Sequence, residues 1–446
     1  MLATSLVALD STIIATAVPS VVASLGGFAQ FPWLFSIYLL AQAVSVPVYG
    51  KLADLFGRKP LMLLGIALFL LGSVLCGVAW SMPALIVFRG IQGLGAGAVQ
   101  PMSVTIAGDI YTLAERAKAQ GYLASVWGIS AVVGPALGGL FSQWVSWRWI
   151  FFVNIPLCLL AGWMLSRNFH EQVARRRPRI DYAGAVLLTA GCSLLMVALL
   201  EGGLAWSWTA PISAGLIIAA LLALIAFVLV ERRAAEPVLP LWVFRRRVLL
   251  ASGLASLMVG AITLGLSSYL PTFAQTSLGV TPIVAGFALA ALTVGWPLAA
   301  AQAGRLYLVI GFRATAVIGA VIGVAGTAAL VTLTQGSPIE MVAVYCFVIG
   351  LGMGLVATPV LIAAQSSVGW SERGVVTGTN MFSRSIGSAL GVAAFGAIAN
   401  ATLAGRAESA GTVAHASHQV FLVVAGAAVV MVLAAMAMPG RSAGSG

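Results

Sequence analysis

Long apolar segments follow one another along nearly the whole chain of 446 residues, with short polar loops between them. About 61% of the residues are hydrophobic and 8% are charged, whereas soluble domains carry about 25% charged residues. So few charges cannot cover a water-soluble surface of this size, and a disordered chain would be polar instead. The composition therefore excludes a soluble enzyme, a secreted disulfide-bonded domain and a disordered protein, and it indicates an integral membrane protein.

A helix needs about 20 residues to cross the hydrocarbon core of a membrane. The apolar segments are unbroken runs of this length, unlike the short alternating segments of a β-barrel, so we predict an all-α integral membrane protein with fourteen spans. Met1 leads directly into the first span without a charged segment or a cleavage site, which favours a retained span over a signal peptide. The predicted spans are roughly residues 1–25, 33–52, 61–80, 83–107, 120–141, 149–167, 181–201, 209–231, 248–273, 281–304, 312–334, 340–365, 377–400 and 419–439.

The basic residues are distributed unevenly between the loops. When the N-terminus is placed inside the cell, most Lys and Arg fall in inner loops and in the C-terminal tail, and only Arg148 and Arg406 fall in outer loops. By the positive-inside rule, this predicts a multi-pass protein of the cell membrane with both termini in the cytoplasm. The net charge of +11 then faces anionic lipid headgroups, which we favour over nucleic acid as its partner.

Glycines and charged residues recur in the same order in the two halves of the chain. Glu115-Arg116 recurs as Glu372-Arg373, and Gly50-Lys51-Leu52 matches Gly304-Arg305-Leu306. Duplicated six-span halves are the architecture of an alternating-access transporter, with the substrate site between the halves. The predicted parts are an N-terminal six-helix bundle (residues 1–167), a central two-helix insertion with basic cytoplasmic loops (168–247), and a C-terminal six-helix bundle with the tail (248–446). We expect the inserted pair to lie away from the cavity.

Asp10 is the one acidic residue that the predicted spans place well inside the membrane. Burial and neighbouring charges decide whether such a carboxyl holds its proton, so Asp10 is the candidate for proton coupling; the alternative is a carboxylate near a wet helix end that only caps or pairs. Arg89 is the natural counter-charge. At about 1.5 Å per residue, the two positions differ in depth by about 12 Å, so we expect a water-mediated link and not a direct ion pair.

Three segments carry specific motifs: residues 50–59 (GKLADLFGRK), residues 128–139 (GISAVVGPALGG) and residues 9–19 (LDSTIIATAVP). With these motifs and the extra central pair of spans, the chain resembles the major facilitator superfamily, and within it the fourteen-span drug:proton antiporter branch. Residues 89–93 (RGIQG) and 147–156 (WRWIFFVNIP) fit the same branch. The branch is chemically diverse, so the resemblance implies a transporter and leaves the substrate open.

The resemblance implies a cytoplasmic gate in the loop after the second span. In the superfamily the Asp of this loop lies against a helix N-terminus of the other half, where the helix dipole favours a carboxylate, and the Arg reaches an acid on span four. The alternative is a surface ion pair worth under about 1 kcal/mol. The copy of this loop in the second half of the chain has Leu308 in place of the Asp. We therefore expect only the loop of the first half to lock the gate. The predicted gate residues are Gly50, Asp54, Gly57, Arg58 and Asp109.

The fifth predicted span contains a candidate hinge. Pro135 removes a backbone donor in mid-span and permits a bend, and Gly134, Gly138 and Gly139 allow close helix contact. The resemblance favours a conformational role for this segment, with packing alone as the alternative.

Sparse polar and aromatic side chains inside the spans predict a large, mostly apolar cavity. Such a cavity suits lipophilic ligands, because a sugar or phosphate would lose hydration there without compensation. Arg384 could offset an anionic substrate group or pair with backbone carbonyls, and each polar candidate could instead join two helices. The candidate lining residues are Tyr38, Gln42, Trp127, Asn154, Tyr269, Phe273, Gln365, Asn380, Phe382 and Arg384.

Together these features predict a monomeric, proton-coupled antiporter that exports amphipathic or lipophilic small molecules by alternating access. An exporter dedicated to one native lipid, peptide or secondary metabolite is the open alternative. The chain has no GxxxxGK[ST] segment, so ATP-driven transport has no support. We expect no catalytic residue, no cofactor beyond the coupling protons and no metal site, with His415 and His418 in a solvated outer loop.

Overall fold

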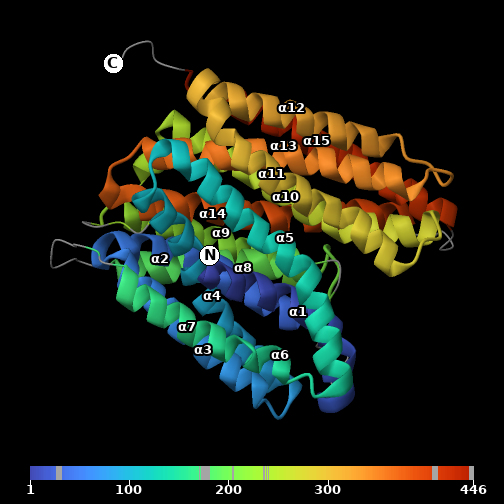
Figure 1. Ribbon diagram of the computed structural model, residues 1–446, viewed down its shortest axis with the longest axis horizontal. Coiled ribbons are helices and arrows are strands. Elements are labelled where there is room, and N and C mark those ends of the chain that lie inside the picture. Colours follow the sequence, from blue (N-terminus) through green and yellow to red (C-terminus); the bar gives the residue numbers. More distant parts are fainter. Residues whose placement is uncertain are drawn as a thin grey trace.

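The computed structural model describes residues 1–26, 33–169, 171, 181–202, 205–234, 237, 239, 241–403 and 410–440, and these form an all-helical protein (Figure 1). The helices are α1 (Leu2–Leu25), α2 (Trp33–Phe56), α3 (Arg58–Gly77), α4 (Met82–Ile110), α5 (Leu113–Trp144), α6 (Trp149–Phe152), α7 (Asn154–Asn168), α8 (Tyr182–Glu201), α9 (Pro211–Glu231), η2 (Leu241–Phe244), α10 (Arg247–Ser277), α11 (Pro282–Ile310), α12 (Phe312–Val331), α13 (Ile339–Ser366), η3 (Trp370–Glu372), α14 (Arg373–Leu403) and α15 (Ala410–Ala437).

Within the described residues, eleven helical segments are long and apolar enough to cross a membrane. They are α2, α3, α4, the segment Trp149–Asn168 formed by α6 and α7, α8, α9, α10, α11, α12, α13 and α15. Helix α1 contributes a shorter apolar stretch, Leu2–Ile14, and α5 and α14 fall outside this set. The all-helical membrane fold predicted from the sequence is therefore confirmed, while the number of fourteen spans stays a prediction.

The long helices pack in two groups that follow the order of the chain. In the first, α1 packs on α4 and α5, α2 packs on α4, and α3 packs on α4 and α7. In the second, α10 packs on α14 and α15, and α13 packs on α11 and α12. The groups meet where α2 lies on α14 and where α5 lies on α11.

Glycines allow close approach at both contacts between the groups. A Cβ atom added to Gly50 of α2 would lie 2.6 Å from the Gly374 carbonyl oxygen of α14, and one added to Gly121 of α5 would lie 2.8 Å from the Ala301 Cβ of α11. Larger residues would separate the helices at these two places.

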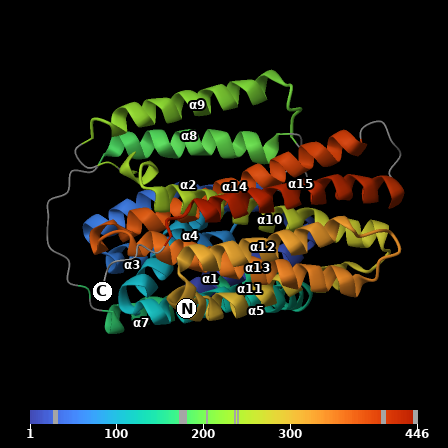
Figure 2. The same ribbon diagram turned by 90° about the horizontal axis from the view of Figure 1, so that it is seen from above.

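Helices α8 and α9 form a pair along one edge of the molecule (Figure 2). The pair is attached through α8, which packs on α2 and α14. Helix α9 exposes large apolar side chains, among them Ile218, Leu222 and Leu229, as expected of a helix that faces lipid.

The span predicted over residues 149–167 matches the candidate span Trp149–Asn168, with a one-residue break at Val153 between α6 and α7. The structure corrects one local prediction. His415 and His418 lie within α15, which begins at Ala410, and not in a loop. The predicted span begins at residue 419, where the apolar run begins. Helix α15 begins earlier, at Ala410, because the alanines before the apolar run have a high helix propensity. Among the described residues, no group of three or more His, Cys, Asp or Glu side chains forms a possible metal site.

Candidate functional site

A buried ion pair joins α1 and α4. The Arg89 guanidinium lies 2.5 Å from the carboxylate of Asp10, and each side chain is only 1% exposed. The other carboxylate oxygen of Asp10 accepts hydrogen bonds from Gln92 at 2.8 Å and from Asn154 at 3.3 Å. Both oxygens therefore have donors, which is what a carboxylate needs in order to stay buried.

The surroundings of this pair fix the guanidinium as well. Arg89 donates to the Leu34 carbonyl of α2 at 3.2 Å and to the Gln92 side chain at 2.8 Å, and its guanidinium carbon lies 4.1 Å from the centre of the Tyr38 ring. Ser73 of α3 accepts hydrogen bonds from both amide side chains of the network, at 2.8 Å from Gln92 and 3.3 Å from Asn154. Side chains of α1, α2, α3, α4 and α7 thus meet at one carboxylate.

The direct contact between Asp10 and Arg89 overturns the water-mediated link predicted from helix rise. That prediction treated the helices as upright with level ends, and helix tilt and a long Arg stem remove such differences. The structure also places Tyr38 and Asn154, predicted as cavity residues, at this ion pair. Sequence analysis missed Ser73, because a single serine in an apolar helix carries no distinguishing signal.

Asp54 connects the end of α2 to the start of α14. Its two carboxylate oxygens accept hydrogen bonds from the backbone amides of Gly374 at 2.9 Å and Val375 at 2.8 Å. These amides belong to the first turn of a long helix, where amides lack helical partners and the dipole favours negative charge. A Cβ atom on Gly374 would lie 2.6 Å from the Asp54 carboxylate, so glycine is required for this approach.

Arg58, at the start of α3 and fully buried, forms the other half of the contact. Its guanidinium lies 2.8 Å from the Asp54 carboxylate and 3.1 Å from that of Asp109 at the end of α4. It also donates to the Trp370 carbonyl at 2.6 Å and stacks 3.8 Å from the centre of the Trp370 ring. The predicted gate residues therefore lie together, with Gly57, at φ +96°, forming the turn between α2 and α3.

Sequence analysis missed three residues at this contact. Glu171 accepts hydrogen bonds at 3.0 Å from the backbone amides of Arg58 and Lys59. Arg373 forms an ion pair with Asp109 at 2.9 Å, and Trp370 covers Arg58. The repeat of Glu372-Arg373 was the signal that could have pointed to Arg373.

The contact between α5 and α11 differs from the one between α2 and α14. Leu308, which matches Asp54 in the repeat, is 42% exposed. The Tyr307 hydroxyl donates instead to the Leu113 carbonyl at the start of α5. Asp54 therefore caps a helix of the other group, whereas Leu308 has no carboxylate with which to do so, and a lock on one side only stays a prediction.

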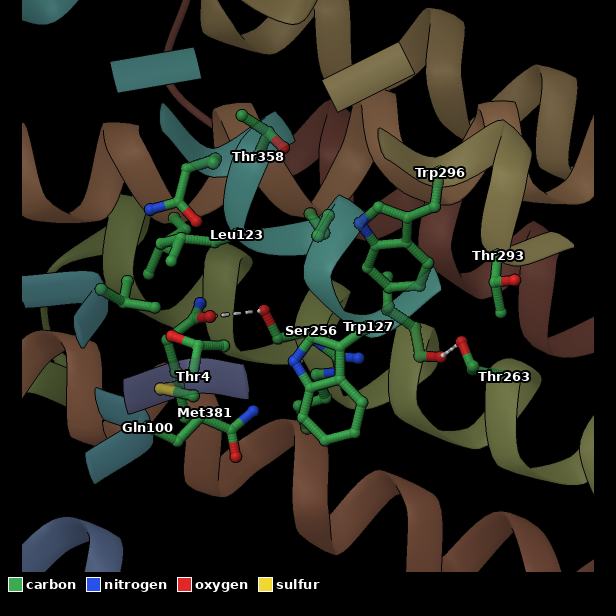
Figure 3. Close-up of a pocket in the computed structure, with 18 of the residues that line it drawn as sticks. Thr4, Gln100, Leu123, Trp127, Ser256, Thr263, Thr293, Trp296, Thr358 and Met381 are labelled. Carbon is green, nitrogen blue, oxygen red and sulfur yellow. Dashed lines mark hydrogen bonds between the residues drawn. The ribbon is translucent and has the colours of Figure 1, made fainter. Parts of the chain in front are cut away.

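A cavity of about 240 Å³ lies between the two groups of helices (Figure 3). Its wall comes from α1, α4 and α5 of the first group and from α10, α11, α13 and α14 of the second, with no residue of α8 or α9. The lining residues are Thr4, Gln100, Val104, Gln120, Leu123, Ala124, Trp127, Ser256, Val259, Thr263, Leu292, Thr293, Trp296, Ala357, Thr358, Leu361, Asn380, Met381 and Arg384.

Of the predicted cavity residues, Trp127, Asn380 and Arg384 line this cavity. Asn380 also joins α14 to α10, because its carbonyl oxygen accepts from Ser256 at 2.9 Å (Figure 3). Gln42 is not a lining residue itself, but its side-chain amide donates a hydrogen bond to Gln100, which lines the cavity.

The other predicted cavity residues have different surroundings. Phe273 packs edge-on against Phe421 at 5.5 Å between ring centres, and Tyr269 packs on the same apolar core. Gln365 is buried and donates to Thr377 at 2.9 Å. Phe382 packs against the apolar cluster that includes residues of α2 and α8. Sequence could not separate these from the true lining, because that depends on how each helix is rotated.

The candidate hinge lies on α5 where it crosses α1. A Cβ atom on Gly134 would lie 2.8 Å from the Cβ of Thr12, and the Thr12 hydroxyl donates to the Ser130 carbonyl at 2.8 Å. Gly138 is buried, whereas a Cβ on Gly139 would meet nothing within 4 Å. The side chain of Pro135 lies outside the described part of the structure.

A cavity between two groups of apolar, membrane-length helices, with a buried ion pair inside one group, is the arrangement expected of a membrane transporter. The comparisons with known proteins agree with this class. The sequence profile of the Major Facilitator Superfamily matches residues 1–181 and 173–392, and the chain belongs to this superfamily as a multi-pass membrane transporter.

Two relatives come from Bacillus subtilis (strain 168). Multidrug resistance protein 3 is 34% identical over 391 residues, which are 88% of this chain and 76% of the relative. Multidrug transporter protein MdtP is 34% identical over 394 residues, which are 88% of this chain and 73% of the relative. The crystal structure of human MFSD10 (TETRAN), titled an organic anion transporter, matches with a TM-score of 0.68 over 97% of both chains at 15% identity, which shows the fold alone.

Proposed function

We propose that this protein is a proton-coupled antiporter that exports amphipathic or lipophilic small molecules by alternating access. The names of the Bacillus subtilis relatives, which refer to multidrug resistance and multidrug transport, support export of such compounds. The mostly apolar cavity with scattered hydroxyl and amide groups supports the same substrate class. We infer fourteen spans in the cell membrane, two six-helix bundles with α8 and α9 inserted between them, cytoplasmic termini and a monomer.

The observation that carries the coupling proposal is the Asp10 carboxylate, buried against Arg89, Gln92 and Asn154. A proton that binds this carboxylate neutralises one partner of the ion pair, which weakens the link between α1 and α4. Asp10 is thus neutral in one conformation and charged in the other. One elementary charge crossing about 100 mV supplies about 2.3 kcal/mol, enough for useful accumulation.

The cytoplasmic gate completes the cycle. In this structure Asp54 and Arg58 of the first group hold the first turn of α14 and the Trp370 segment of the second. Release of these contacts opens the cavity at this end, and re-formation closes it. Both states must be accessible, so the gate contributes to the interconversion of conformations more than to the affinity for the substrate.

The test measures export and proton release separately. Everted vesicles are given a panel of neutral, anionic and cationic lipophilic compounds, with and without a collapsed pH gradient. We expect export of several chemically different compounds that stops when the gradient collapses. Export of a single compound from the panel would support the dedicated exporter, and export unaffected by the gradient would refute proton coupling.

The same assay on Asp10→Asn tests the assigned carboxylate. We expect this variant to fold and to bind neutral ligand, but to lose gradient-driven accumulation and ligand-induced proton release in detergent. Glu340→Gln is the matched control, since Glu340 is exposed at the start of α13. Proton release that survives undiminished in Asp10→Asn would move the coupling site elsewhere, first to Asp54 and Asp109.

A further inference from the structure

The cavity contains a cation on one wall. Arg384 lies well inside α14 and its side chain is exposed to the cavity that it lines. The guanidinium carbon lies 4.9 Å from the centre of the Trp296 ring, so an aromatic face covers one side of the charge. A charged residue inside a membrane span is costly and is retained where it has a function.

Among the described residues, no carboxylate pairs with Arg384. Asp10 is bound to Arg89, while Asp54 and Asp109 are bound to Arg58 and Arg373. The described lining of the cavity contains threonine, serine, glutamine and asparagine side chains but no Asp or Glu. The charge of Arg384 is therefore not neutralised by a carboxylate of the described chain.

The remaining lining provides an apolar surface next to this charge. Trp296 of α11 and Trp127 of α5 lie among the lining side chains in Figure 3, and both are partly buried. Leu123, Val259 and Leu292 line the same space. Aromatic faces accept flat apolar groups, and a guanidinium binds carboxylate or sulfonate oxygens through paired N–H donors.

We propose that this cavity selects amphipathic organic anions, meaning a carboxylate or sulfonate on a flat apolar body, and that Arg384 binds the anionic group. The proposal rests on the function proposed above and specifies the charge of its substrate. A lipophilic cation meets a like charge and finds no carboxylate on the described wall, so the site discriminates by repulsion as well as by attraction.

The experiment uses three probes with one ring system: 2-naphthoate, neutral 2-naphthamide and the cation 2-naphthyltrimethylammonium. Binding to the purified full chain in detergent is measured by calorimetry. We expect 2-naphthoate to bind more tightly than the amide by about tenfold or more, as for a hydrogen bond to a charged group, and the cation to bind most weakly. Equal affinity for the three probes, or preference for the cation, would overturn the proposal without the use of any variant.

Variants then test whether Arg384 causes the preference for the anionic probe. Arg384→Gln should remove the advantage of 2-naphthoate over 2-naphthamide, whereas Arg384→Lys, which keeps the charge, should retain part of it. Arg313→Gln removes the same charge from an exposed position at the start of α12 and should change nothing. An unchanged preference for 2-naphthoate in Arg384→Gln would contradict the assignment, as would an equal loss in Arg313→Gln.

Uptake of the probes into everted vesicles shows whether a negative result contradicts the anion selectivity or the proposed export. If 2-naphthamide and 2-naphthoate are moved equally well and bound equally well, the anion selectivity fails and export stands. If 2-naphthoate binds through Arg384 and no probe is moved, the anion site stands and export of these compounds fails.

Discussion

The carboxylate of Asp54 caps the first turn of α14 by accepting a hydrogen bond from the Val375 amide at 2.8 Å. The two residues belong to different halves of the chain, so this bond joins the two groups of helices at this end. Cap hydrogen bonds contribute about 1 kcal/mol, and those to a charged group contribute about 1.5–3 kcal/mol. A contact of this strength could bias a conformational equilibrium and still be released in the proposed transport cycle.

Asp54→Asn should weaken this cap, because the amide group is uncharged and only one of its two atoms accepts a hydrogen bond. We expect faster hydrogen–deuterium exchange in the first turn of α14 and turnover that falls by about tenfold, with ligand affinity nearly unchanged. Glu340→Gln serves as the control for loss of an exposed carboxylate. Equal losses of affinity and turnover would assign Asp54 to the substrate instead.

Gly374→Ala should open the same contact by steric means, since the added Cβ would lie 2.6 Å from the Asp54 carboxylate. Backbone and helix must shift to relieve such a distance, so we expect faster exchange in α14 and an increased population with the gate open. Gly426→Ala is the matched control, because a Cβ at Gly426 of α15 meets nothing within 4 Å. Identical exchange in Gly374→Ala and the parent would show that the contact tolerates the extra atom.

Arg58→Lys should impair the gate although it preserves the charge. The guanidinium contacts Asp54, Asp109 and the Trp370 carbonyl at once and stacks on the Trp370 ring, whereas an ammonium is a point charge without a planar face. We expect lower turnover and a lower melting temperature, with Arg313→Lys unaffected because Arg313 is exposed. Full activity of Arg58→Lys would mean that charge alone suffices at this position.

Arg89→Gln should destabilise the fold by leaving the buried Asp10 carboxylate without its cation. Breaking a buried pair by removal of one partner costs about 3–5 kcal/mol, and thermal unfolding in detergent measures the loss. The double variant Asp10→Asn/Arg89→Gln carries no unpaired charge and should recover much of the stability. A double variant less stable than Arg89→Gln would show that the ion pair is not the source of the effect.

The amino-acid sequence alone determined the fold class, whereas the gate is what its resemblance to the superfamily implies. Unbroken apolar runs of about 20 residues form helices in a membrane. Lipid offers no hydrogen-bond partners to the backbone polar groups, and a helix pairs these groups internally. The contact of Asp54 with a helix of the other half and the approach of Arg58 to Asp109 follow from the resemblance of residues 50–59 to the superfamily's loop, and the structure shows both contacts. The position of α8 and α9 away from the cavity lining could be predicted, because the internal repeat omits these two helices.

Only the tertiary structure decided which buried polar groups meet. Helix rise predicted a gap between Asp10 and Arg89, and the structure shows direct contact, because small changes in tilt and side-chain direction add up over the length of a helix. Helix rotation placed Trp296 in the cavity and Phe273 in the core, although both are aromatic residues in apolar helices. The sequence places Arg384 inside a predicted span, but the absence of a carboxylate beside it in the described structure depends on the packing of helices from both halves of the chain.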